Sequence, residues 1–407
     1  MLVPTITIFD QNAGTHRRRM CLAITVSFSL CCSLALWAQS PNSPSDNSQS
    51  NAANQSWTAT TESQRQNEDP MRTIESHAQS GNRTFDKQSI ERRGSDGLFV
   101  PYQDIEKETV QVDASTVRTI TRTFDRNANG VSTLVGVVEE EKRTTATGDS
   151  NVIRTTSTPD VNGNLRLTQR QTEETKKISA NAEETQTTVM LPSVNGGLAQ
   201  TEKVKERREQ GANGTVQSEK TTMLPDGAGK WQVSEIKRTT TTQAGDNSTT
   251  SQQVSVSVPD SEGNLGVVSR TVSNAIVIAP EEKHDTVETY SINVPGAVGD
   301  GALHLFQRAT TNQRTSSTGQ QITQQQVEQS NPGDPSSGLQ VSTVTIDTVN
   351  PSASGAQATR TVQARDANAS FPVIAVDTTK SDNIHAVQVQ IAPGEKPKDA
   401  PKKDVKK

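Results

Sequence analysis

The residues that come closest to a chemical site lie in the run Asp125-Arg126-Asn127-Ala128-Asn129-Gly130. Side-chain oxygens at alternate positions before a glycine are typical of the opening of a calcium-binding loop. The twelfth position, where such a loop carries a bidentate glutamate, is Gly136. The same place in the neighbouring repeats is a plain hairpin turn. Asp125, Asn127 and Asn129 are therefore a calcium candidate that the sequence does not favour, and we expect a turn there.

No other motif indicates catalysis. None of the five histidines has a cysteine or a second histidine at metal-ligand spacing. The sequence also contains no Gly-X-Ser-X-Gly elbow, phosphate loop or dinucleotide fingerprint. We therefore expect no catalytic residue, no cofactor and no metal, and a protein that is not an enzyme. The scattered histidines are His16, His77, His284, His304 and His385.

The composition argues against several well-packed domains. Only 30% of the 407 residues are hydrophobic and only 3% are aromatic. Adding the 25 glycines brings the fraction to about 36%, against the roughly 45–50% apolar-plus-glycine usual for globular chains, so any core must be thin. The net charge is -5 and the two signs are interleaved along the chain. That pattern gives no basic field for a nucleic acid, and we expect no such partner.

The N-terminus has the features of an export signal. Arg17, Arg18 and Arg19 precede an apolar run that ends in small residues at Ala38, which predicts a signal peptide over residues 1–38. The alternative is a membrane anchor, because this run approaches the ~20 residues that span a bilayer. Its small residues favour cleavage, so we expect no membrane span afterwards. The predicted location is exported: periplasmic, cell-surface or extracellular. The three cysteines all lie in the signal, at Cys21, Cys31 and Cys32.

Two further stretches are predicted to be disordered. Residues 39–99 are rich in Ser, Asn and Gln, and Trp57, Met71 and Phe85 are lone large apolar side chains. Such a segment buries too little surface to offset its ordering entropy. Residues 393–407 combine Lys with Pro and lack large apolar groups. The bland interpretation of this tail is a solubilising segment; the sharper one is a tether to glycans or to an anionic envelope surface.

A repeat occupies residues 100–392. Its marker is a Pro, then a turn of Gly, Asn or Asp, then a large apolar residue, and it recurs about every 33–38 residues. The clearest copies are Pro159 to Leu165, Pro192 to Leu198, Pro225 to Trp231 and Pro259 to Leu265. A second Gly/Asn turn lies between successive markers, which makes each unit a hairpin. Thr and Val dominate the segments between turns and favour strands.

These patterns predict an all-β fold: an extended antiparallel up-and-down meander of repeated Thr-rich hairpins with a thin core. Abundant Thr and a turn about every 16 residues exclude a helical fold. Disorder is the rival, and the regular repeat argues against it. Apolar residues crowd beside the Pro turns. The strand ends away from them are polar on both faces, as in Thr201 to Glu209. A membrane-spanning barrel is disfavoured, because its strands need ~9–11 residues with an apolar outer face.

The functional prediction follows from export, repetition and the lack of a site. We expect an exported non-enzymatic structural or surface-interaction protein with a repetitive β-sheet array. The alternative is a carbohydrate- or peptide-binding module of the envelope or extracellular space. A third possibility, a hydrolase with a dispersed site, conflicts with a thin sheet that offers no deep pocket.

Overall fold

The computed structural model describes residues 56–382 except 128, 212, 245–247, 295–300, 332–336 and 353–354. The predicted signal peptide, the first part of the predicted spacer and the Lys-rich tail lie outside the described residues. Within the described part of the chain, no helix is long and apolar enough to cross a membrane.

The described chain forms twenty β-strands. Their bounds are β1 Ser56–Arg65, β2 Met71–Ser80, β3 Arg83–Arg93, β4 Phe99–Gln111, β5 Thr116–Arg126, β6 Ser132–Thr144, β7 Ser150–Pro159, β8 Leu165–Ser179, β9 Ala182–Pro192, β10 Leu198–Gln210, β11 Val216–Pro225, β12 Trp231–Gln243, β13 Thr249–Pro259, β14 Leu265–Ala279, β15 Glu282–Ser291, β16 His304–Thr315, β17 Gln321–Ser330, β18 Leu339–Ser352, β19 Gly355–Ala364 and β20 Val373–Ser381.

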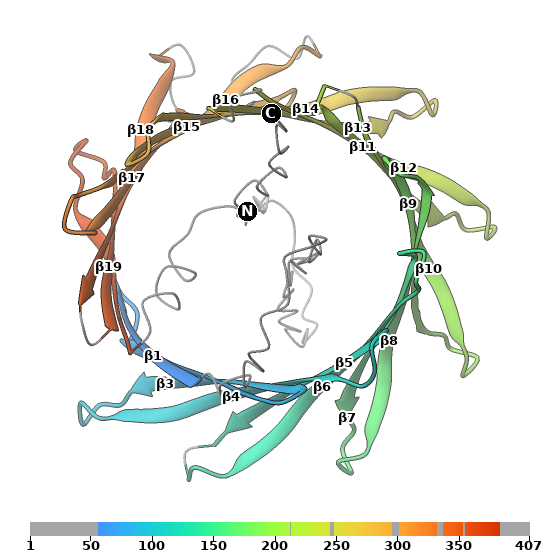
Figure 1. The fold of residues 1–407 in the computed structure, drawn as a ribbon, viewed down its shortest axis with the longest axis horizontal. Coiled ribbons are helices and arrows are strands. Elements are labelled where there is room, and N and C mark those ends of the chain that lie inside the picture. Colours follow the sequence, from blue (N-terminus) through green and yellow to red (C-terminus); the bar gives the residue numbers. More distant parts are fainter. Residues whose placement is uncertain are drawn as a thin grey trace, which may run out of the picture. The chain divides into compact units, whose positions relative to one another are not determined.

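The strands form an antiparallel meander that closes into a barrel. Each strand pairs with the next along the chain, and β1 also pairs with β20, from Ala59 opposite Ser381 to Arg65 opposite Ala375. Figure 1 shows the resulting ring, in which the blue first strand lies beside the red last strands. The predicted all-β meander of hairpins is confirmed. Closure satisfies the backbone groups that a sheet edge would leave unpaired.

The turns alternate between the two ends of the barrel. The Pro-turn markers all follow odd-numbered strands, at the ends of β7, β9, β11 and β13 in the clearest copies, and the turn that begins at Asp160 is the best example. Asp160 Oδ1 accepts hydrogen bonds from the backbone N–H groups of Asn162 and Asn164, at 2.9 and 3.0 Å. Gly163 follows at a φ of 80°, in the left-handed region that glycine adopts without a Cβ clash. The predicted turns thus separate the strands where the sequence placed them.

The strand ends beside these marker turns bend outward. A register shift occurs close to the turn in most of the hairpins, for example between Thr156 and Ser157 of β7 and between Val256 and Ser257 of β13. An extra residue in one strand bends it and increases its twist. Figure 1 shows the hairpins flaring away from the ring around the circumference. We call this end of the barrel the flared rim: turns 94–98, 127–131, 160–164, 193–197, 226–230 and 260–264 with their flanking strand residues.

The core is thin, as the composition predicts. The buried hydrophobic residues are few and are alanine or β-branched; Val349, Ala356 and Ala358 form one small cluster, and the others lie around the wall. The set comprises Ala59, Val137, Val204, Ile236, Val349, Ala356 and Ala358. Full side-chain burial is therefore limited here, and the strands are also held by the ladder of backbone hydrogen bonds and by cross-strand side-chain pairs.

The structure differs from the predicted boundary of the spacer. The strands β1, β2 and β3 lie within residues 39–99, so from Ser56 onward this stretch belongs to the barrel. The lone apolar side chains Trp57, Met71 and Phe85 all fall on these strands. The β-structure therefore starts well before residue 100. Threonine-rich strands with polar residues on both faces have a composition close to that of a disordered spacer.

Candidate functional site: the lumen and its closing seam

The pairing register assigns the strand residues to the two faces of the wall. Residues opposite each other in an antiparallel pair point to the same face. Thr61 lies opposite Thr73 on β2 and opposite Thr379 on β20. Following the register from strand to strand around the ring returns to Thr61 on the same face. The closed wall therefore has two consistent faces.

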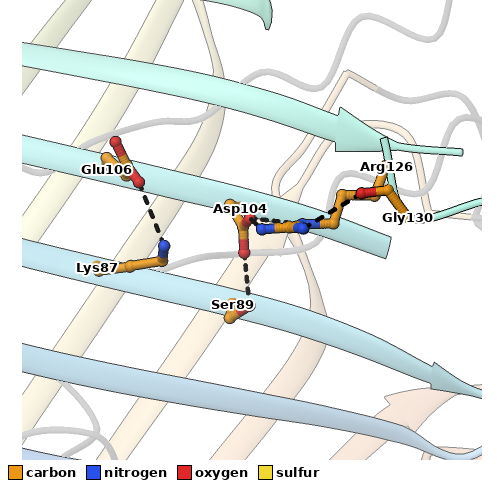
Figure 2. Close-up of polar contacts among 6 residues, drawn as sticks. All are labelled: Lys87, Ser89, Asp104, Glu106, Arg126 and Gly130. Atoms are coloured by element: carbon orange, nitrogen blue, oxygen red, sulfur yellow. Dashed lines mark hydrogen bonds and ion pairs between the residues drawn. The ribbon is translucent and has the colours of Figure 1, made fainter. Parts of the chain in front are cut away.

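The face that carries Thr61 lines the lumen. Side chains of a closed, single-layered wall converge on the inner side, and this face is crowded near the seam: Ala59 and Ala358 are each only 1% exposed. A cleft of about 240 Å³ also opens on it. The opposite face is the outer one. In Figure 2 its side chains stand on the near side of the wall, and strands of the far side of the barrel lie behind them.

The lumenal cleft spans the seam where the two ends of the meander meet. All of its lining residues belong to the lumen face and come from β1, β2, β3, β19 and β20. They are Thr61, Thr73, Glu75, Gln88, Ala358, Arg360, Asp377 and Thr379. The hydroxyl oxygens of Thr61 and Thr379 lie 2.8 Å apart across the seam. The cleft exists only because the barrel is closed.

Charged groups in and beside the cleft are partly paired. Arg360 donates to Asp347 on β18 through Nε at 2.7 Å and Nη2 at 2.9 Å. The hydrogen bond with Asp347 raises the pKa of Arg360, against the opposing effect of burial, and the guanidinium stays charged. Asp377 Oδ1 is buried and has no hydrogen-bond partner in the described part of the chain. Glu75 accepts from Gln88 Nε2 at 3.0 Å.

These groups can bind a hydrophilic solute by hydrogen bonds. The lining offers hydroxyls, an amide, two carboxylates and one guanidinium. The same lining contains no cysteine or histidine. The chemistry of the cleft is that of a polar binding surface along a lumen.

Farther along the lumen face, a histidine is paired with a carboxylate. His77 Nδ1 lies 2.6 Å from Asp86 Oδ1, and its ring stacks on Trp57 at a centroid distance of 5.6 Å. The sequence interpretation missed this contact because it assigned the segment to a spacer. No local motif reveals it, since the three residues come from three different strands.

The outer face carries rows of ion pairs. Many join direct cross-strand partners, as Lys87 does with Glu106 at 3.3 Å. Arg308 on β16 lies between two carboxylates, Glu288 at 2.9 Å and Glu328 at 3.6 Å. Such exposed pairs contribute little individually, about 0–1 kcal/mol. Together they make the middle of the outer wall strongly polar.

One outer cluster is buried, and Figure 2 shows it at the junction of β3, β4 and β5. Asp104 is 2% exposed. Its Oδ1 accepts from Ser89 Oγ at 2.5 Å, and its Oδ2 accepts from Arg126 Nε at 2.7 Å and Nη2 at 2.5 Å. Burial by itself would raise the pKa of Asp104, but the bond from Ser89 and the pair with Arg126 outweigh it and lower that pKa.

The calcium candidate is built as a turn. Asn127 Oδ1 accepts from the backbone N–H groups of Asn129 and Val131, each at 3.0 Å. Asp125 Oδ1 accepts from Gln103 Nε2 at 2.9 Å. Asn127 thus takes the role that Asp160 takes in its own turn. No group of three or more His, Cys, Asp or Glu side chains that could hold a metal occurs among the described residues.

No known protein family and no curated protein matches this sequence. Solved structures do match it. The copper transporter OprC has 6% identity over 81% of this chain and 80% of its own, with a TM-score of 0.39. The siderophore receptor PirA from Pseudomonas aeruginosa has 9% identity over 80% of each chain, with a TM-score of 0.37. A loop-deletion mutant of OmpT, an outer membrane protein of Vibrio cholerae, has 8% identity over 81% of this chain and 98% of its own, with a TM-score of 0.26.

The predicted function is wrong. A structural or surface-interaction array, or its alternative of a carbohydrate- or peptide-binding module, was inferred from an extended sheet. The sheet instead closes on itself through the pairing of β1 with β20 and encloses a lumen. None of these three solved structures is named as an enzyme. The expectation that this chain is not an enzyme stays a prediction. At 6–9% identity these structures carry no information about a cargo.

Proposed function

We propose that this protein is a conduit for hydrophilic solutes in the cell envelope. The observation that carries the proposal is a closed wall of twenty strands whose lumen face is polar. Twenty strands about 4.8 Å apart and tilted by about 40° give a backbone circumference near 125 Å and a diameter of roughly 40 Å. Barrels with 16–18 strands already leave an aqueous channel.

The lumen wall is suited to passage rather than tight capture. Residues of both charge signs alternate on it with Thr and Gln, as on β9 and β10, where Glu183 lies 3.9 Å from Arg208. Balanced charges of this kind do not repel solutes of either sign. The seam cleft adds one place where a hydrophilic solute can rest through hydrogen bonds. Export, which the N-terminal signal predicts, would bring the barrel to the envelope.

The proposal is tested by measuring access to the lumen. No cysteine occurs after Cys32, so single cysteines can be placed in the mature chain without background. Thr187→Cys puts a thiol on the lumen face of β9, opposite Val204; the matched control Thr188→Cys puts one on the outer face, opposite Lys203. Both are reacted with hydrophilic maleimides of increasing mass.

We expect the small reagents to label both variants and the largest to label only the outer thiol. A passage of limited width excludes the largest reagents from the thiol of Thr187→Cys, which lies in the lumen, but not from that of Thr188→Cys, which lies outside. If the smallest reagent fails to reach Thr187→Cys in the folded protein, the lumen is not a passage and the proposal is wrong. Equal rates for both variants at every mass would also contradict it, because they would mean that the wall does not enclose a lumen.

A further inference from the structure

The flared rim exposes apolar side chains in a repeated arrangement. Val161 and Val194, at the tips of two marker turns, are fully exposed, and Leu165 is 51% exposed. Others of the same kind occur on the hairpins around the rim: Leu98, Val131, Leu167, Leu198, Leu265 and Val267, while Leu191 and Leu224 are exposed on the lumen face of their hairpins. Exposed apolar surface of this extent marks a contact with a partner or a membrane.

The strand residues of the rim alternate between the two faces. On β8, Leu165 and Leu167 belong to the outer face and Arg166 between them to the lumen face. On β12, Trp231 and Val233 belong to the outer face and Gln232 to the lumen face. An apolar outer face over a polar inner face is the pattern of a barrel wall in contact with lipid. Below the bulges the middle of the outer face becomes charged, and the exposed apolar residues at the opposite end, such as Ile178 and Ile278, do not recur on successive hairpins as those of the rim do.

Cations lie directly behind aromatic residues of the rim. Lys203 Nζ is 4.3 Å from the centre of the Trp231 ring, and the Arg72 guanidinium is 4.0 Å from that of Phe99. Aromatic rings with adjacent Lys or Arg are typical of protein surfaces at the level of lipid headgroups. Lys203 in that position reaches a headgroup phosphate while its stem stays on apolar surface, whereas Arg72 is already paired with Glu62 at 2.8 Å.

We propose that the flared rim docks on a lipid membrane and inserts into one leaflet. The apolar part of a hairpin, from the bulge to the turn, is three to four residues tall, which is about 10–13 Å. That height is about half of the ~25 Å apolar band of a spanning barrel. The charged wall below the bulges stays in water, where its ion pairs remain solvated.

A membrane explains the arrangement better than a protein partner does. The same apolar pattern recurs on successive hairpins at one end of a closed ring. A planar apolar phase contacts all of these hairpins together, whereas a single protein partner would have to reproduce the ring. The docking itself does not depend on the proposed conduit. Only its biological use does, because docking places one mouth of the lumen against a membrane.

The test compares two fourfold variants of the whole protein. The rim variant is V161S/V194S/L165S/L198S. The control is I178S/I276S/I278S/I322S, which removes four exposed apolar side chains from the opposite end of the barrel. All eight positions are exposed, and circular dichroism and melting confirm that each variant folds. Flotation with vesicles of phosphatidylcholine and phosphatidylglycerol measures binding.

We expect the rim variant to lose at least about tenfold in vesicle affinity, since a single inserted leucine contributes that much, and the control to bind like the wild type. Brominated lipid should quench Trp231, as judged against W231F. Equal binding by the rim variant, or an unquenched Trp231, overturns the inference. A wild type that forms rim-dependent dimers and ignores vesicles also overturns it, in favour of a second copy. A lumen that stays reachable at Thr187→Cys while docking fails would leave the conduit standing.

Discussion

Replacing Asp104 by asparagine should destabilise the barrel more than any change to an exposed ion pair. The asparagine would keep the size of the side chain and could still accept from Ser89, but Arg126 would lose its carboxylate partner. Removing one partner of a buried pair costs roughly 3–5 kcal/mol. The Arg126 side chain is 29% exposed and can recover part of its hydration. We therefore expect a loss of about 2–3 kcal/mol.

Urea unfolding of the variant and of its partners in a double-mutant cycle measures this loss. The cycle combines Asp104→Asn with Arg126→Gln, and the coupling between them should be at least about 1 kcal/mol. Glu141→Gln is the control: it removes the exposed pair with Arg143, whose side chains are 39% and 70% exposed. We expect it to cost less than about 0.5 kcal/mol. If Asp104→Asn and Glu141→Gln shift the urea midpoint equally, the buried Asp104–Arg126 pair does not stabilise the barrel more than an exposed pair, and the reasoning is wrong.

Three further predictions concern pH, the seam and a turn. Because the pKa of Asp104 is lowered below its ordinary value of 3.8, its contribution is complete above that value and is lost as pH falls through the folded pKa; the acid side of the stability profile should flatten in Asp104→Asn. Gly355→Ala places a Cβ against the Ser381 carbonyl oxygen, far inside van der Waals contact, so its urea midpoint should fall well below that of Gly266→Ala, whose Cβ meets nothing within 4 Å; equal midpoints would contradict this. Gly263→Ala, at a φ of 86°, should cost about 1 kcal/mol and speed hydrogen exchange only near the turn between β13 and β14; unchanged exchange there would count against a strained turn.

The hairpins could be read from the sequence because their signals are local. The marker turn from Asp160 to Asn164 needs a side-chain acceptor at its start and a glycine near its end, and the amino-acid sequence shows both. The strands between such turns are rich in Thr and Val, which indicate a pleated surface wherever they occur. Local chemistry therefore fixes where the chain reverses and which segments extend between the reversals.

Closure could not be read in the same way. It depends on β1 and β20, whose paired residues Thr61 and Thr379 are 318 positions apart, and nothing in either threonine indicates that these hydroxyls meet. The first three strands also resemble a spacer in composition, so the strand that completes the ring was assigned to disorder. The seam cleft shares this origin, because its lining residues come from both ends of the meander. A site built by closure has no signal in either half of the chain.

Closure also explains how a wall with so few buried apolar residues holds together. An open sheet of this composition would expose two edges of unpaired backbone groups and would gain little from side-chain burial on either face. Pairing β1 with β20 satisfies both edges, and each strand then has a hydrogen-bonded neighbour on both sides. The polar faces follow, because a ladder of backbone bonds does not require an apolar layer. For the conduit proposed above, such a wall lets the lumen stay hydrated, because its inner face carries polar side chains at no cost to the hydrogen-bonded ladder.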